Sequence, residues 1–425
     1  MRYAVLALAV LAAIAMPAHA QLRGHGGPVR ALAITADGQT AISGSFDETA
    51  IRWSLARDAA EQVMRFHDGS VNAVTVLPDG RFVTAGQDRS VAVWDPGIDH
   101  PTTIFTGHEA PVVSLAAAPN GALLASASWD HTVRLWPLVG DDARVLEGHQ
   151  QNVNGVAFMP DGRALVSAGY DLTLRIWPLA GGAPTVVTLP TPLNAVAVAA
   201  DGEIVTGGAD GKIYFVSPSG ELRGAVAAAE TPIIAIALSR DGALIAAAGV
   251  RGSVAIIDRR TRTVTRTLVG PGLPVWSAVF LPDNRTLLTG GTDRMIRRWD
   301  TVTGDPIGGV AVGGAEDTLA PFAGDHGAEV FRACVACHTL RADAIHRAGP
   351  TLAGIFGRHI ASLPGYRYSE ALRKLDIVWT PATVAKLFEV GPATYTPGTK
   401  MPEQKIGSAE DREALVKFLE KATKP

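Results

Sequence analysis

Cysteine is almost absent from this sequence. The chain of 425 residues contains two cysteines, Cys334 and Cys337, and both lie in the stretch FRACVACHTL at residues 331–340. Two cysteines allow at most one disulfide or one redox-active dithiol. His338 follows the second cysteine directly, and a Cys-x-x-Cys-His pattern has a third interpretation, which is covalent attachment of a c-type haem.

Long apolar runs are absent except at the start of the chain. Residues 4–16, AVLALAVLAAIAM, follow Arg2 and precede AHA at residues 18–20, which predicts a signal peptide over residues 1–20, cleaved before Gln21. An uncleaved anchor helix is the alternative, but the run is short for a bilayer span of about 20 residues. We therefore expect an exported, soluble protein with no membrane span after cleavage.

An excess of charge is also missing. The net charge of −3 gives no indication of a nucleic-acid partner. Lysine occurs once in residues 21–324, at Lys212, but seven times in residues 325–425. The net charges of these two regions are −7 and +3, so composition divides the chain in two.

The first three hundred residues repeat with a period near forty. The four strongest copies end at Trp53, Trp94, Trp136 and Trp177, and three weaker copies end at Val216, Ile257 and Trp299. Each strong copy holds a short apolar strand, such as VNGVAFM, and then a turn signal, such as PDG. The period, the Gly-His near the start and the Trp near the end resemble the WD-repeat family.

The resemblance implies a seven-bladed β-propeller over residues 21–312, with four antiparallel strands in each blade. A last outer strand over residues 306–312 is expected to complete the seventh blade. The repeats are compact, and no His, Asp or Glu cluster stands outside the repeat pattern. By analogy of fold alone, we expect such a propeller to bind proteins or peptides on one rim.

Four histidines occupy equivalent positions in the strong copies, and four histidines together could form a metal site. They are His25, His67, His108 and His149. In the WD-repeat family such a histidine joins a strand Ser or Thr, a turn aspartate and the strand Trp in a hydrogen-bonded tetrad. The turn aspartates here are Asp47, Asp88, Asp130 and Asp171. The resemblance therefore implies one structural tetrad per blade, whereas the last three copies, which lack the histidine, should rely more on apolar packing.

Residues 325–425, after an expected linker over residues 313–324, resemble a class I cytochrome c along nearly their whole length. The resemblance implies one haem c, tethered by thioethers at Cys334 and Cys337, with His338 as the proximal iron ligand. The predicted fold class is therefore two domains, an all-β seven-bladed propeller and a small all-α cytochrome c domain.

A second iron ligand is expected from Met401, in the stretch YTPGTKMP. The other methionines lie in the signal segment or the propeller: Met1, Met16, Met64, Met159 and Met295. His/Met ligation raises the reduction potential of a haem. Ligation by two histidines is the alternative, with His326, His346 and His359 as competitors.

Further residues match the family around the haem. Pro350 matches a proline whose carbonyl accepts a hydrogen bond from the proximal imidazole. Arg358, Tyr368 and Trp379 match residues around the haem propionates, although the two aromatic residues could be plain core residues. Thr399 matches a hydroxyl beside the methionine loop.

Three positions depart from the family pattern. The sequence has Asp343 and Ala361 where glycines are expected, and Leu372 where an inward polar residue is expected. The departures affect loop detail rather than the presence of haem.

A final helix over residues 408–423 is predicted, capped by Ser408, with Leu415, Phe418 and Leu419 on the face toward Val330 and Phe331.

Three functions are compatible with these features. The first is an electron carrier whose propeller docks a redox partner, and the second is an oxidoreductase whose propeller holds a substrate or a second cofactor. The third is a haem redox sensor. Lysines of the C-terminal region could meet an acidic partner or form an ordinary solvated surface: Lys374, Lys386, Lys400 and Lys405. A signal peptide with haem c implies a bacterial periplasm, although release from the cell stays open.

Overall fold

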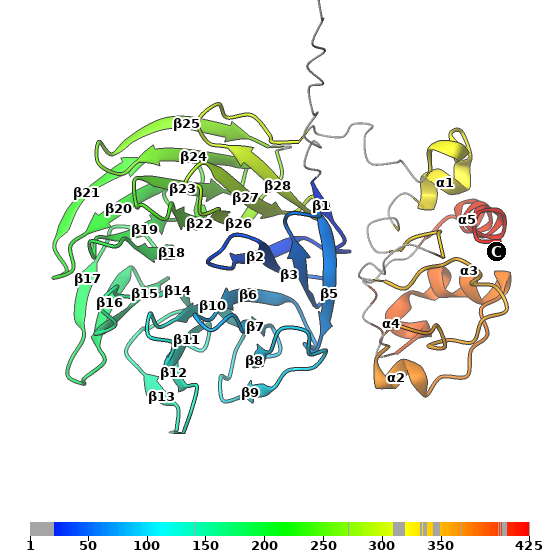
Figure 1. Cartoon of the computed structure of the whole chain (residues 1–425), viewed down its shortest axis with the longest axis horizontal. Helices are drawn as coiled ribbons and strands as arrows, with labels where there is room; N and C mark the ends of the chain where they lie inside the picture. Colours follow the sequence, from blue (N-terminus) through cyan, green and yellow to red (C-terminus); the bar gives the residue numbers. More distant parts are fainter. Residues whose placement is uncertain are drawn as a thin grey trace, which may run out of the picture.

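The chain forms a ring of seven β-sheets with a small helical domain beside strand β5 (Figure 1). The computed structural model describes residues 21–424, apart from gaps at 141, 271, 309–318, 332–333, 335–337, 343–348, 367, 398, 400 and 402–405. The prediction of a seven-bladed propeller followed by a small helical domain is confirmed. The predicted signal peptide and residues 313–318 of the expected linker lie outside the described residues.

Each blade is a four-stranded antiparallel sheet, and its innermost strand contacts the innermost strands of the neighbouring blades. Blades 1 to 4 consist of β2 (Val29–Ile34), β3 (Thr40–Ser45), β4 (Thr49–Ser54) and β5 (Ala59–Arg65); β6 (Val71–Val76), β7 (Phe82–Gly86), β8 (Val91–Trp94) and β9 (Thr103–Phe105); β10 (Val112–Ala117), β11 (Leu123–Ser128), β12 (Val133–Pro137) and β13 (Arg144–Leu146); and β14 (Val153–Phe158), β15 (Ala164–Gly169), β16 (Thr173–Pro178) and β17 (Thr185–Thr188).

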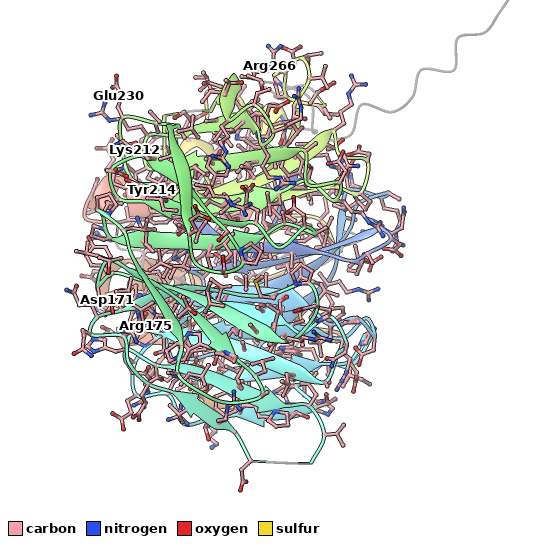
Figure 2. The ribbon with its side chains drawn as sticks, turned by 90° about the vertical axis from the view of Figure 1, so that its left-hand side faces the viewer. Asp171, Arg175, Lys212, Tyr214, Glu230 and Arg266 are labelled. Carbon is pink, nitrogen blue, oxygen red and sulfur yellow. The ribbon has the colours of Figure 1, made fainter. Side chains whose placement is uncertain are left out.

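The last three blades follow the same order, except at the outer strand of blade 7. They consist of β18 (Leu193–Val198), β19 (Ile204–Gly208), β20 (Lys212–Val216) and β21 (Leu222–Ala227); β22 (Ile233–Leu238), β23 (Leu244–Gly249), β24 (Ser253–Asp258) and β25 (Thr263–Val269); and β26 (Val275–Phe280), β27 (Thr286–Gly291) and β28 (Met295–Asp300), with β1 (Leu22–Arg23). Figure 2 shows the side of the ring that carries Tyr214 of β20 and Arg266 of β25.

The N-terminal strand closes the ring. Leu22 pairs with Ile296 and Arg23 with Met295, so β1 is the fourth strand of blade 7. The expectation of an outer strand over residues 306–312 therefore missed β1, which supplies the fourth strand. Residues 309–312 lie outside the described residues, so the expected strand is tested only at its start, where Pro306 forms an isolated bridge to Trp299 and the Ile307 N–H donates to the Arg298 carbonyl at 2.9 Å. Because β1 comes from the opposite end of the propeller sequence, it joins the first and last blades.

The predicted tetrads are confirmed in blades 1 to 4. In blade 1, His25 lies 3.0 Å from Asp47 through Nδ1 and 2.7 Å from Ser43 Oγ through Nε2. The indole of Trp53 donates to the same Ser43 hydroxyl at 2.7 Å. The other tetrads are His67, Asp88, Thr84 and Trp94; His108, Asp130, Ser126 and Trp136; and His149, Asp171, Ser167 and Trp177. These four histidines are thus used within separate blades.

The tetrad aspartate also closes the hairpin that contains it. Glu48 has a φ of 66°, in the left-handed region that non-glycine residues rarely adopt. The Asp47 carboxylate accepts hydrogen bonds from the Thr49 backbone N–H at 3.0 Å and from its hydroxyl at 2.6 Å. These bonds offset the backbone strain, which costs on the order of 1–2 kcal/mol.

Apolar packing replaces the tetrad between blades 5 and 6. Fully buried aliphatic and aromatic side chains from both blades form one cluster: Val205, Ile213, Phe215, Ile233, Ile245, Ala247, Ala255 and Ile257. In blade 7, Trp299 keeps the indole bond, which reaches Thr289 Oγ1 at 2.8 Å. A comparable apolar cluster lies between blades 3 and 4, which keep the tetrad, so the expectation that the last blades rely more on apolar packing stays a prediction.

The helical domain consists of short helices around a long final one. They are η1 (Ala320–Phe322), α1 (His326–Phe331), α2 (Glu370–Arg373), α3 (Pro381–Val390), α4 (Pro392–Tyr395) and α5 (Ala409–Ala422). Ser408 caps α5 by accepting from the Asp411 backbone N–H at 3.2 Å, as predicted. A Cβ on Gly327 would lie 2.1 Å from the Ala414 carbonyl oxygen, so this glycine allows α1 to pack closely on α5.

The core of this domain lies at that crossing. The rings of Phe331 and Phe418 are 5.3 Å apart, and Leu415 and Leu419 are buried in the same cluster.

None of the helices in the described part of the chain has both the length and the apolar character to cross a membrane.

Candidate functional site

A cavity in the helical domain brings the predicted site residues together. It contains about 1320 Å³ of empty space, part of it open to solvent. Eight predicted site residues line it: Cys334, His338, Pro350, Arg358, Tyr368, Trp379, Thr399 and Met401. Cys337, the ninth, lies outside the described residues. Residues separated by more than sixty positions in the sequence thus converge on one space.

His338 is held in a defined orientation at the cavity wall. Its Nδ1 lies 2.8 Å from the carbonyl oxygen of Pro350 and donates to it, so Nε2 is the nitrogen suited to a metal. A Cβ on Gly349 would lie only 2.4 Å from Cε1 of His338, so the ring position requires glycine there. The Gly-Pro pair therefore positions the imidazole in two ways, by a hydrogen bond and by close packing.

Met401 approaches the cavity from the loop that follows α4. Its backbone N–H donates to Thr399 Oγ1 at 3.1 Å, and the Thr399 N–H donates to the Thr396 carbonyl at 3.0 Å. The side chain of Met401 is half-buried and packs against the apolar core. An imidazole and a thioether thus line the same cavity, and these are the two axial ligands that c-type cytochromes use.

Cys334 is buried beside the imidazole. Burial raises the pKa of its thiol to about 12, while the positive charge of Arg294, in the β27–β28 hairpin of blade 7, acts in the opposite direction. A redox dithiol requires a cysteine whose thiolate forms near neutral pH. The environment of Cys334 therefore does not favour the redox-dithiol interpretation of the pair.

Arg358 and Trp379 are held by a small backbone ladder. The Trp379 N–H donates to the Arg358 carbonyl at 2.9 Å, and the Gly357 N–H donates to the Trp379 carbonyl at 2.8 Å. The Arg358 guanidinium donates to the carbonyls of Thr351 at 2.9 Å and Ala353 at 3.2 Å. Burial lowers the pKa of Arg358, although this guanidinium stays protonated at neutral pH.

Tyr368 contributes a polar end to the cavity wall. Burial raises the pKa of Tyr368, and the nearby charge of Arg358 opposes this rise.

Leu372 also lines the cavity, at the position where a polar residue was expected. Ala361 has a φ of 58°, which explains why the family prefers glycine at that position. Asp343 lies outside the described residues.

Two of the three competing histidines, His326 and His359, do not line the cavity. His326 lies 2.7 Å from Asp411 and His359 lies 3.0 Å from Asp376, and both are exposed. The hydrogen bond with Asp376 raises the pKa of His359. His346 lies outside the described residues. Among the described histidines, His338 therefore lines the cavity and these two do not.

Sequence reasoning missed the contribution of the propeller to this cavity. Asp47, Thr49 and Arg65 of blade 1 line it together with Tyr366 of the helical domain. The guanidinium carbon of Arg65 lies 4.7 Å from the centre of the Tyr366 ring. No sequence signal could have revealed this contact, because repeat position and haem motifs carry no information on how the two domains meet.

The residues present fit a haem. The cavity has largely apolar walls, with an oriented imidazole, a thioether and a buried cysteine, and polar groups at one part of its lining. A flat macrocycle with a central iron and carboxylate side groups requires such a combination. The chemistry of the donor set therefore agrees with the attachment pattern in the sequence.

Comparisons with known proteins give the same result for each domain. The WD domain, G-beta repeat family matches residues 18–54, 60–95, 99–137, 140–178 and 262–300, and the cytochrome c family matches residues 324–423. Cytochrome c of Kluyveromyces lactis is 38% identical over 99 residues, which are 23% of this chain and 89% of that protein.

Two other relatives cover the same region. Cytochrome c of Cochliobolus lunatus is 40% identical over 99 residues, 23% of this chain and 91% of that protein. Cytochrome c2 of Rhodoplanes tepidamans is 41% identical over 93 residues, 22% of this chain and 86% of that protein. Through the helical domain that follows its WD-repeat propeller, the chain belongs to the cytochrome c family.

Proposed function

We propose that this protein is an exported electron carrier, with one covalently bound His/Met-ligated haem c and a propeller that docks its redox partner. A cytochrome c domain binds haem c for electron transfer, and the observation that carries the finer proposal is the convergence of His338 and Met401 on one cavity. When bound, the haem supplies one-electron exchange between Fe(III) and Fe(II).

Each residue of the site has a distinct task in this proposal. Cys334 and Cys337 tether the haem, and His338 and Met401 hold its iron. Pro350 keeps the proton on Nδ1 of His338, and this bond also makes the ligand more basic. Around the propionates and the methionine loop, the proposal places Arg358, Tyr368, Trp379 and Thr399.

Covalent attachment of the haem and cleavage of the signal peptide can be tested on the full-length chain. The chain is expressed with residues 1–20 in a bacterium that matures c-type cytochromes, and the N-terminus of the exported product is sequenced. One haem per chain should remain with the polypeptide after denaturation and acidic organic extraction. Haem that is extracted completely would contradict covalent attachment, and product beginning at Met1 would contradict cleavage.

Met401→Ala should retain the haem but lose the thioether ligand. The reduction potential should then fall by on the order of 0.1 V or more, within the span of about 0.8 V that axial ligands cover. His359→Ala is the matched control and should leave the potential and the absorbance spectrum unchanged. The reverse pattern would show that His359 is the ligand.

Three exposed aromatic residues support docking by the propeller. Phe46, Trp129 and Tyr170 follow the second strands of blades 1, 3 and 4, at equivalent hairpin positions, and are 43%, 41% and 45% exposed. Aromatic side chains are enriched where proteins contact partners. Replacing both Trp129 and Tyr170 with alanine should slow haem reduction by a periplasmic protein fraction at unchanged potential. Ile104→Ala, on outer strand β9, is the control.

The charge of the helical domain supports an acidic contact surface on the redox partner. Lys374 and Lys386 are exposed on this domain, while Lys400 and Lys405 lie outside the described residues. Lys386 also lies 2.8 Å from Glu389, so part of its charge is balanced locally. Changing Lys374 to glutamate should slow reduction at low ionic strength and have little effect at high salt. An equal effect at both ionic strengths would contradict an electrostatic role.

A further inference from the structure

One part of the haem cavity is built by the propeller. Arg65 is the last residue of β5, and it pairs across the sheet with Thr49 of β4. Figure 1 shows β5 on the side of the ring that faces the helical domain. Arg65 and Thr49 line the same cavity as His338 and Met401, although they lie more than 270 residues away in the sequence.

Arg65 contacts Tyr366, one of two neighbouring tyrosines that line the cavity. Its guanidinium carbon lies 4.7 Å from the centre of the Tyr366 ring, and that ring meets Tyr368 edge-on at a centroid distance of 4.7 Å. Tyr366 and Tyr368 both line the cavity. The cation is thus fixed against the wall of the haem site by a cation–π contact.

The charge of Arg65 has no anion within the described part of the protein. Its Nη2 atom is buried and has no hydrogen-bond partner among the described residues, and no ion pair of Arg65 occurs there. The Asp47 carboxylate lines the cavity too, but its oxygens accept from His25, Gly26 and Thr49. Burying a guanidinium donor without an acceptor costs free energy, so an acceptor from outside the polypeptide, and an anionic one above all, would stabilise this position.

A haem in this cavity would supply the anion. Its two propionate carboxylates are acidic, and a planar guanidinium fork matches a carboxylate geometrically. Arg358, the arginine of the helical domain at the cavity, directs its donors to the carbonyls of Thr351 and Ala353. We propose that Arg65 of the propeller is the counter-ion of a haem propionate, and this inference rests on the proposed function.

The consequence is that the propeller is part of the cofactor site. A positive charge beside the haem favours the reduced iron, because reduction removes one positive charge from the site. Docking of the two domains and the reduction potential are therefore linked, and any event that separates the domains lowers the potential. Arg65 acts through its charge beside the haem carboxylate and does not contact the iron itself.

The test compares three full-length, haem-loaded variants with the wild type. Arg65→Gln should lower the midpoint potential, and Arg65→Lys, which keeps the charge, should recover most of the difference. Arg266→Gln is the matched control, because Arg266 is exposed on β25, the outer strand of blade 6 (Figure 2). It should leave the potential unchanged.

The pH dependence of the potential tests the direct contact. With Arg65 in place, the pKa of the propionate is held low. In Arg65→Gln this pKa rises, so the pH range over which the potential falls with rising pH should move upward. Small-angle X-ray scattering of the same samples should show an unchanged separation of the domains.

The outcomes separate this inference from the proposed function. Haem-loaded Arg65→Gln with the potential and pH profile of the wild type overturns the inference and leaves the proposed function intact. An equal fall in Arg65→Gln and Arg65→Lys, accompanied by separated domains, also overturns it, because the effect would then come from undocking. A wild-type chain without covalent haem would overturn the proposed function itself.

Discussion

The two domains satisfy their buried polar groups in different ways. In blades 1 to 4 of the propeller, each tetrad histidine has both ring nitrogens bonded to residues of its own blade. In the helical domain, His338 uses Nδ1 for Pro350 while the ring lines a cavity with Met401 and Cys334. The tetrads are complete within the polypeptide, whereas the cavity of the helical domain is lined by residues that fit a cofactor.

The same residue type therefore has opposite roles in the two domains. A histidine with an aspartate and a hydroxyl at its two nitrogens is a structural element, because no nitrogen is left for a metal. A histidine whose Nδ1 donates to a backbone carbonyl is oriented so that Nε2 can bind a metal. Changes that remove the haem should therefore lower the stability of the helical domain, and changes in a tetrad should lower the stability of the propeller.

The largest expected effect comes from removing both tethers. Replacing Cys334 and Cys337 with alanine should allow the haem to be extracted, and the helical domain should lose much of its thermal stability, because a ligand that binds only the folded state stabilises it. The propeller should keep its own transition. Differential scanning calorimetry of the full-length chain measures both.

A shift of both transitions by the same amount would contradict this independence. Replacing Ser362, an exposed serine of the helical domain, with alanine controls for nonspecific damage to that domain. That variant should retain its haem after denaturation and extraction.

The second effect is the converse, a tetrad broken at its aspartate. Asp130→Ala leaves His108 buried without one of its partners and removes the bonds that close the hairpin at Thr132. The cost to the propeller should be about 3–5 kcal/mol, the range for a buried pair that loses one partner. Chemical denaturation, followed by tryptophan fluorescence, measures it.

Asp161→Ala is the matched control, because Asp161 lies in an exposed turn and accepts one backbone hydrogen bond from Arg163. Its cost should be well below that of Asp130→Ala. Equal costs would show that the tetrad contributes no more than an ordinary turn. The haem spectrum should stay unchanged in both variants.

Much of this comparison could be predicted from residues close together in the sequence. The tetrads could be predicted because a histidine and an aspartate recur 21 or 22 residues apart, as His25 and Asp47 do. The haem site could be predicted because its motifs are local stretches such as CVACH and YTPGTKMP. Strand β1 was not predicted, because two residues, Leu22 and Arg23, carry no repeat signal. Arg65 was not predicted either, because its role depends on how the domains meet.

The third effect is the acid sensitivity of the propeller. Burial alone would raise the pKa of Asp47, but the charge and hydrogen bond of His25, with hydrogen bonds from Thr49 and Gly26, hold it at about 2. A carboxyl whose pKa is depressed in the folded state contributes stability above its unfolded value of about 3.9. That contribution, roughly 2–3 kcal/mol, is lost as the pH falls from 4 toward 2.

Thermal unfolding of the propeller, followed at several pH values, measures this loss. Asp47→Asn should show a flatter pH dependence in this window, since the titrating group is gone. The same slope in Asp47→Asn and the wild type would assign the acid sensitivity to other carboxyls.

The smallest effect tests whether local changes in the helical domain stay local. Ser408 accepts a hydrogen bond from the Asp411 N–H at the start of α5, and its replacement by alanine should cost about 1 kcal/mol. Because α5 packs on α1 beside the haem attachment turn, the loss should appear in the helical transition and not in that of the propeller. A change of the propeller transition in this variant would mean that the two domains unfold together, and the contrast between them would then hold for their chemistry but not for their stability.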